Sequence, residues 1–100
     1  MLKKLPVTCP SCNSKLKVKS LICKDCETVI EGIYELPLLA LMNNKEQEFI
    51  ISFIKHSGSL KEMAKEMNLS YPTVRNLLDD IIANVKSTEA NLKNNNINNQ

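Results

Sequence analysis

Four cysteines constrain this chain of 100 residues more than any other feature. Cys9-Pro10-Ser11-Cys12 is followed, ten residues later, by Cys23-Lys24-Asp25-Cys26. Each Cys-x-x-Cys pair is a tight turn that offers two thiolates, and two such turns complete a tetrahedral zinc site. A closed set of four thiolates indicates a structural ion, because a catalytic zinc keeps a position open for water. The pattern therefore predicts one structural Zn²⁺ bound by Cys9, Cys12, Cys23 and Cys26.

Three other uses of the cysteines fit the sequence less well than zinc does. Two disulfides would require export, and the start of the sequence, Met1 to Pro6, lacks the apolar run of a secretory signal. A thioredoxin-like role needs a single pair near a βαβ pattern, which is not seen. An iron–sulfur centre uses the same ligands and remains an alternative.

The apolar stretches 36–42 and 49–54 are too short to span a bilayer. We therefore expect a cytoplasmic protein without a membrane partner.

The hydrophobic pattern changes along the chain and predicts a small α+β protein. Residues 7–34 alternate in places between apolar and polar, as a half-buried strand does, and Gly32 is a candidate bulge. Residues 36–86 show helical spacing, and 87–100 are polar. We predict a zinc ribbon of short antiparallel strands (1–35), an all-α unit (36–86) and a tail (87–100) that is disordered or a frayed helix end.

Local signals predict where the helices begin and end. Asn44 is expected to cap a helix from Lys45 to about His56. Ser59-Leu60-Lys61-Glu62 has the form of a capping box at the start of the next helix. Asn68 is expected to end that helix in a left-handed conformation, and Ser70 to cap the last one.

Residues 60–79 resemble a helix-turn-helix. Ala64 is small enough to let the two helices approach, and Leu69, Val74 and Leu77 are the expected inward positions. In this motif the start of the second helix enters the major groove of DNA. Arg and Asn have the donor geometry for guanine and adenine edges, and Tyr and Thr can contact phosphates. The candidate DNA-binding residues are Ser70, Tyr71, Thr73, Arg75 and Asn76.

The charge distribution leaves a protein-docking role open for the helices. Residues 1–26 carry a net charge of +5, 27–58 carry −3 and 59–86 carry zero. Phosphate contacts dominate DNA affinity, and Asp79 and Asp80 would repel phosphate if they faced it. His56, the only histidine, is interpreted as a residue near a helix C-terminus rather than as a metal ligand.

The sequence shows no catalytic constellation, so we expect neither an enzyme nor a small-molecule substrate. Glycine occurs only at positions 32 and 58, which excludes a glycine-rich phosphate loop. The single histidine has no evident nucleophile beside it, and the carboxylates are scattered.

The order of these motifs resembles the bacterial and archaeal family catalogued as domain of unknown function 2089. The residues that carry the resemblance are Leu5 to Cys12, Cys23 to Cys26, Val29 to Gly32, Glu35 to Pro37, Gly58 to Glu62 and Ser70 to Arg75. The resemblance implies a zinc ribbon followed by a helix-turn-helix like that of sigma factors, and a role in transcription. It also implies that all four cysteines are metal ligands.

We therefore predict a transcription regulator that binds DNA through the helices, with the zinc ribbon as a folding anchor. A homodimer is expected because one small motif buries little interface, and the last helix, extended toward Lys93, is the candidate dimer element. The alternative is an adaptor that docks on RNA polymerase, a sigma factor or another regulatory protein.

Overall fold

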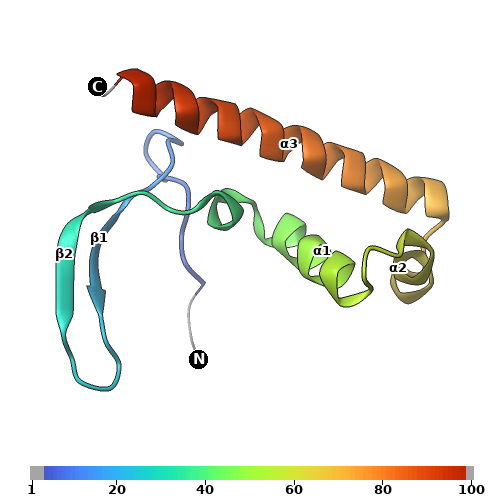
Figure 1. Cartoon of the computed structure of the whole chain (residues 1–100), viewed down its shortest axis with the longest axis horizontal. Helices are drawn as coiled ribbons and strands as arrows, with labels where there is room; N and C mark the ends of the chain where they lie inside the picture. Colours follow the sequence, from blue (N-terminus) through green and yellow to red (C-terminus); the bar gives the residue numbers. More distant parts are fainter. Residues whose placement is uncertain (1–3, 99–100) are drawn as a thin grey trace. The chain divides into compact units, whose positions relative to one another are not determined.

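The structure, a computed structural model, describes residues 4–98 and divides into two units. The first unit, up to Leu41, contains a two-stranded antiparallel sheet and a short 3-10 helix, and the second, from Met42, contains three α-helices (Figure 1). The elements are β1 (Val18–Ile22), β2 (Val29–Tyr34), η1 (Leu38–Leu41), α1 (Asn44–Lys55), α2 (Leu60–Met67) and α3 (Tyr71–Asn98). The predicted small α+β fold is confirmed.

The β1–β2 hairpin contains the bulge that was predicted at Gly32. Val18 pairs with Tyr34 whereas Ser20 pairs with Glu31, so β2 holds one extra residue between those two pairs. A Cβ on Gly32 would lie 2.9 Å from the ring of Tyr34. Glycine therefore leaves the space that the tyrosine ring occupies.

The first unit buries very little apolar surface. Among residues 4–41, only Leu36 and Leu41 are buried. The large apolar side chains that remain exposed in this unit are Leu5, Leu21, Ile22, Val29, Ile30, Ile33, Tyr34 and Leu39. A two-stranded hairpin is marginal on its own in water, so this unit needs another source of stability.

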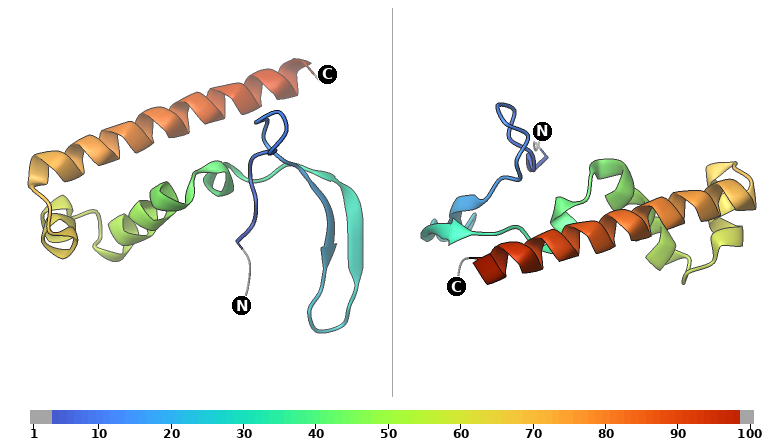
Figure 2. Two further views of the ribbon diagram at one scale, coloured as in Figure 1. Left: turned by 180° about the vertical axis from the view of Figure 1, so that it is seen from behind. Right: turned by 90° about the horizontal axis from the view of Figure 1, so that it is seen from above.

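The second unit has a continuous hydrophobic core. Its buried members are Phe49, Leu60, Met63, Ala64, Val74 and Ile81, with Ile50, Phe53, Leu78 and Val85 packed against them. Met63 of α2 and Val74 of α3 are completely buried. Figure 2 shows α2 crossing the N-terminal end of α3, and α1 lying alongside the same helix. Every helix of this unit thus contributes to one core.

The first helix of this unit is capped one residue earlier than predicted. Asn43, not Asn44, is the cap, because its Oδ1 accepts from the Glu46 N–H at 2.8 Å. The Asn43 N–H donates in return to Glu46 Oε1 at 3.0 Å, which completes a capping box. At α2 half of the predicted capping box is confirmed, since Ser59 Oγ accepts from the Glu62 N–H at 3.2 Å, whereas the Ser59 N–H donates to the His56 carbonyl at 3.0 Å instead of to Glu62.

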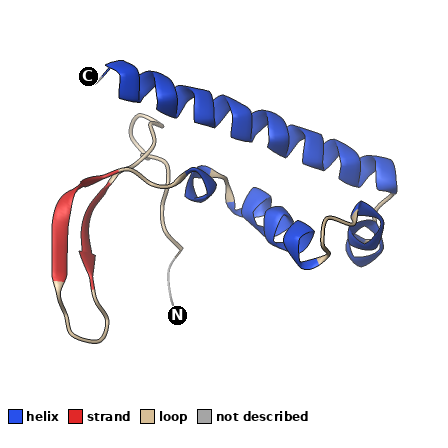
Figure 3. Ribbon diagram, viewed as in Figure 1, coloured by secondary structure: helices blue, strands red, loops and turns tan. Residues whose placement is uncertain are grey.

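The polar segment after residue 86 is helical as far as the structure describes it. The sequence predicts a disordered tail or a frayed helix end from residue 87, whereas α3 continues to Asn98 (Figure 3). Within this stretch Thr88 Oγ1 donates to Asn84 Oδ1 at 3.4 Å, across one turn of the helix. Asn99 and Gln100 lie outside the described residues.

Leu69 and Leu77, which were expected to pack inward, are partly exposed, and so is Met67 of α2. Leu69 is 41% exposed, and Met67 and Leu77 are each 37% exposed. The prediction of inward packing was wrong for Leu69 and Leu77, and Met67 does not belong to the buried face of α2. Helical spacing indicates which side of a helix is apolar, but a neighbouring helix must still cover that side. Met67 and Leu77 line a groove that is described below.

No helix among residues 4–98 combines the length and the apolar character that crossing a membrane requires.

Candidate functional site

The two cysteine pairs form the same turn twice. The Cys9 N–H donates to the Ser14 carbonyl at 2.8 Å, and the Asn13 N–H donates to the Cys9 carbonyl at 2.9 Å. The corresponding bonds of the second turn, Cys23 to Thr28 and Glu27 to Cys23, measure 2.8 and 2.9 Å. Asn13 and Glu27, which follow the second cysteine of each pair, both have φ of 63°. Such φ values are uncommon outside glycine, so their repetition shows that both cysteine pairs adopt the same specific turn conformation.

Hydrogen bonds in each turn favour the thiolate form of the second cysteine. The side chain of Ser14, then its backbone, and then Cys9 lower the pKa of the Cys12 thiol. The side chain of Thr28, then its backbone, and then Cys23 lower the pKa of Cys26 in the same way. The Thr28 Oγ1 lies 3.0 Å from Cys26 Sγ. Thiolates are the form that binds metal, so both turns are suited to it.

The structure forms each pair separately and does not bring the two pairs together. None of the four cysteines forms a disulfide bond. The first pair precedes β1 and the second lies in the loop between β1 and β2, at the far end of the hairpin (Figure 1). Within residues 4–98 no three His, Cys, Asp or Glu side chains are arranged to hold a metal ion. The donor chemistry nevertheless fits zinc, because thiolates are soft ligands that zinc and iron–sulfur centres prefer.

The connection between α2 and α3 is a tight turn of the helix-turn-helix type. Asn68 ends α2 in the left-handed conformation (φ 57°, ψ 43°), as predicted. The Leu69 N–H donates to the Ala64 carbonyl at 3.0 Å, which closes the end of α2. Ala64 is buried and small, and Val74 of α3 is completely buried. This packing fixes which side of α3 faces solvent.

The five candidate DNA-binding residues are all exposed, and two of them, Ser70 and Thr73, bond to each other at the start of α3. The five residues are Ser70, Tyr71, Thr73, Arg75 and Asn76. Ser70 Oγ accepts from the Thr73 N–H at 3.2 Å and lies 2.8 Å from Thr73 Oγ1. Ser70 therefore caps α3 as predicted, and the Thr73 hydroxyl is bonded to this cap. Tyr71, Arg75 and Asn76 are left as the side chains that are presented to solvent.

The candidate base-reading arginine is held by an acidic neighbour. Arg75 Nη2 lies 3.2 Å from Asp79 Oδ1, and both side chains are 52% exposed. The sequence analysis treated Asp79 only as a repelling charge, although the spacing of four residues is the usual signal for such a pair. An exposed pair of this kind contributes only about 0.3–0.5 kcal/mol, so a stronger acceptor can replace it.

His56 connects two helices and lies apart from the cysteine turns in the sequence. It is the C-terminal cap residue of α1, as predicted. Its Nδ1 donates to the Ser52 carbonyl at 2.7 Å, and its Nε2 lies 2.6 Å from Glu66 Oε2. Both ring nitrogens are therefore engaged, which supports a structural role.

Two cysteine turns, one before a β-hairpin and one in its loop, are followed in the chain by a helix-turn-helix, and this order is typical of proteins with a zinc ribbon and a helix-turn-helix. Comparison with family models agrees: the DUF2089 zinc ribbon matches residues 9–40, and the domain of unknown function (DUF2089)-HTH matches residues 42–88. The chain belongs to the DUF2089 family, as its motifs predicted. No curated protein and no solved structure matches the chain.

Proposed function

We propose that this protein is a DNA-binding transcription regulator whose helix-turn-helix reads DNA with the first turns of α3. One observation carries the proposal. Val74 is buried in the core, whereas Tyr71, Arg75 and Asn76 are exposed at the end of α3 that follows the turn. A recognition helix contacts base edges with its N-terminal residues, and arginine and asparagine have the required donors.

The two aspartates that could oppose DNA binding lie in different surroundings. Asp79 is paired with Arg75, so its charge is partly neutralised at the reading surface. Asp80 lines the groove with Leu77 and Ile81. Each residue turns a helix by about 100°, which places Asp80 about 140° from Arg75. Asp80 therefore points away from DNA that is bound by Arg75.

We also propose that Cys9, Cys12, Cys23 and Cys26 hold one structural Zn²⁺. The support comes from the repeated turns, the lowered pKa values of the Cys12 and Cys26 thiols and the family match. The ion would supply folding free energy to a unit that buries little apolar surface. A homodimer through α3 remains part of the proposal, because a single motif of this size buries little interface.

Binding to genomic duplex fragments tests the proposal, with mobility shifts recorded at several salt concentrations. Arg75→Ala should remove the preference for one base at one position of the site. It should also weaken binding to the preferred duplex by about 1–3 kcal/mol. Lys55→Ala removes the same charge from the last turn of α1 and is the matched control. It should leave base preference unchanged.

Two results would contradict the proposal. One is the absence of binding to any duplex at low salt, which favours the adaptor function. The other is binding of Arg75→Ala with unchanged sequence preference, which would remove α3 from the reading role.

A further inference from the structure

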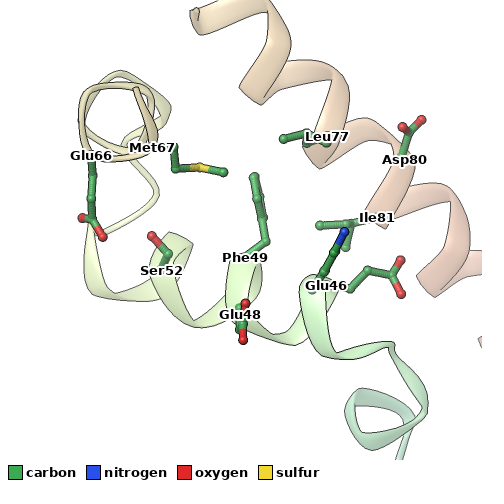
Figure 4. Close-up of a pocket in the computed structure, with 10 residues that line it drawn as sticks. Glu46, Glu48, Phe49, Ser52, Glu66, Met67, Leu77, Asp80 and Ile81 are labelled. Carbon is green, nitrogen blue, oxygen red and sulfur yellow. The ribbon is translucent and has the colours of Figure 1, made fainter. Parts of the chain in front are cut away.

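The helical unit contains a groove that DNA binding does not use. It has a volume of about 560 Å³ and is formed by α1, α2 and α3. Phe49, Met67 and Leu77, one from each helix, point toward one another in it (Figure 4). The remaining lining residues are Lys45, Glu46, Glu48, Ser52, Glu66, Asp80 and Ile81. The groove thus has an apolar centre and a charged border.

The apolar centre is incompletely covered. Met67 and Leu77 are each 37% exposed, although both lie beside the buried Phe49. Apolar surface that is gathered in a concave site and bordered by polar groups is typical of an interaction surface. A ligand that covers these side chains would gain hydrophobic free energy from the area removed from water.

The border is acidic. Four carboxylates line the groove against a single lysine. Glu46 accepts from Asn84 Nδ2 at 2.9 and 3.0 Å, and Glu66 pairs with His56. The carboxylates of Glu48 and Asp80 form no ion pair or hydrogen bond within residues 4–98. These two charges are available to a cationic partner.

We propose that this groove binds a basic amphipathic helix of a partner protein. Its apolar side chains, spaced i, i+3 or i+4 and i+7, would cover Phe49, Met67 and Leu77. Its lysines or arginines would meet Glu48 and Asp80, which gives charge complementarity.

A helix suits the groove better than an extended peptide. The walls of the groove are α-helices, whose central backbone groups bond within the helix. An extended peptide gains affinity by adding to a free strand edge, and these walls offer none. A bound helix satisfies its own backbone and presents only side chains, which is what the groove can accept.

The groove and the proposed DNA-reading surface lie on different sides of α3. Leu77 is about 160° from Arg75 around the helix, and Asp80 about 140°. A partner helix in the groove would therefore leave Arg75 accessible. The inference does not rest on DNA binding, because groove occupancy is measured without DNA.

A designed peptide probes the groove in the full-length protein. The peptide is a fluorescein-labelled amphipathic helix with leucines at the helical spacing above and lysines elsewhere, and its control carries glutamates in place of the lysines. Fluorescence anisotropy should show saturable binding of the lysine peptide alone. Asp80→Lys and Glu48→Lys should each weaken it about threefold to fivefold, as expected for exposed charge pairs.

Asp79→Lys is the matched control, since it makes the same charge change about 100° around α3 and outside the groove. It should leave the peptide affinity within about twofold. Leu77→Gln changes a partly exposed position, so the fold should be retained. It should weaken peptide binding because the apolar centre of the groove loses one of its side chains.

Three results would overturn the inference. They are no saturable binding of the lysine peptide, equal binding of the two peptides, and equal loss in Asp79→Lys and Asp80→Lys. Sedimentation of the protein alone tests another occupant. Self-association that Asp80→Lys abolishes would assign the groove to a second copy of this chain and would also overturn the inference.

Discussion

The two units of this chain bury their apolar residues to very different extents. The helical unit encloses a core in which Met63 and Val74 are completely inaccessible. In the ribbon, Ile22 is 66% exposed and Ile33 80% exposed, although both belong to strands. Local hydrogen bonds in the two cysteine turns are the most regular feature of that unit.

The difference indicates two sources of stability within one short chain. Burial of apolar surface is the main favourable term in the folding of the helical unit. A unit of about 40 residues rarely buries enough surface to fold without a metal or disulfides. Metal binding by its four cysteines, as proposed above, would supply this stability.

Removal of the metal should give the largest difference between the two units. A strong chelator is expected to unfold the ribbon, since structural zinc supplies on the order of 10 kcal/mol. The helical signal in far-ultraviolet circular dichroism should remain, while amide peaks of residues 7–34 collapse in a two-dimensional NMR spectrum. A fourfold Cys→Ser variant should behave like the chelated protein.

Metal would not be the source of the ribbon's stability if its NMR spectrum stayed unchanged in chelator while elemental analysis showed that the metal was gone. A loss of α-helical signal together with the ribbon would also count against two independent sources of stability.

A core substitution should destabilise the helical unit and leave the ribbon unaffected. Met63→Ala removes a completely buried side chain and should lower the free energy of unfolding of the helical unit by about 2–5 kcal/mol. Urea denaturation followed by circular dichroism measures this change. Met67→Ala alters the same residue type on the same helix at a 37% exposed position, so its cost should be clearly smaller. Equal costs would show that α2 does not pack as described, and bound zinc should be unchanged in both variants.

The cap of α1 offers a smaller effect that separates two adjacent residues. Asn43→Ala should lower the free energy of unfolding of the helical unit by about 1 kcal/mol, because the Glu46 N–H loses its acceptor. Asn44→Ala, within the first turn, should change it by less than about 0.5 kcal/mol. The same denaturation experiment measures both, and a reversed order would support the cap that the sequence analysis predicted.

The difference between the predicted cap, Asn44, and the observed cap, Asn43, illustrates what the sequence could and could not predict. Short-range signals were reliable where one residue type suits a left-handed backbone, as at Asn68, or a close approach by a neighbouring side chain, as at Gly32. Two neighbouring asparagines have equal capping propensity, and they are distinguished only by the two bonds that Asn43 forms with Glu46, one accepted by its side chain and one donated by its backbone N–H. The sequence alone could not decide between them, since Asn43 with Glu46 and Asn44 with Gln47 both have the spacing of a capping box.

The candidate sites were predictable to a different extent. The cysteine turns follow from spacing alone, and the exposure of Arg75 follows from the helical period. The groove was not predictable, because the period cannot show that no helix covers Leu77. Coverage depends on the lengths of α1 and α2 and on how they pack, which are properties of the tertiary structure.

The smallest expected effect concerns the thiols of the ribbon and tests whether its turns are built for metal. Ser14→Ala and Thr28→Val remove the side chains that contribute most to lowering the pKa of Cys12 and Cys26. In the metal-free protein, each substitution should raise the pKa of the corresponding thiol toward its ordinary value. Thiolate absorbance followed against pH measures this shift.

The sign of the pH effect follows from the direction of the pKa shift. A thiol whose pKa is lower in the folded chain contributes stability above its ordinary pKa, and this contribution is lost as pH falls through the lowered value. Metal ligands must also be thiolates, so acid releases zinc. Because the variants protonate their thiols more readily, they should release zinc at a higher pH than the parent protein. Ser11→Ala is the matched control, since Ser11 contacts Cys9 Sγ through its backbone N–H at 3.4 Å, which alanine keeps. Identical release curves for Ser14→Ala, Thr28→Val and this control would mean that the repeated hydrogen bonds shape the turns without tuning their thiols.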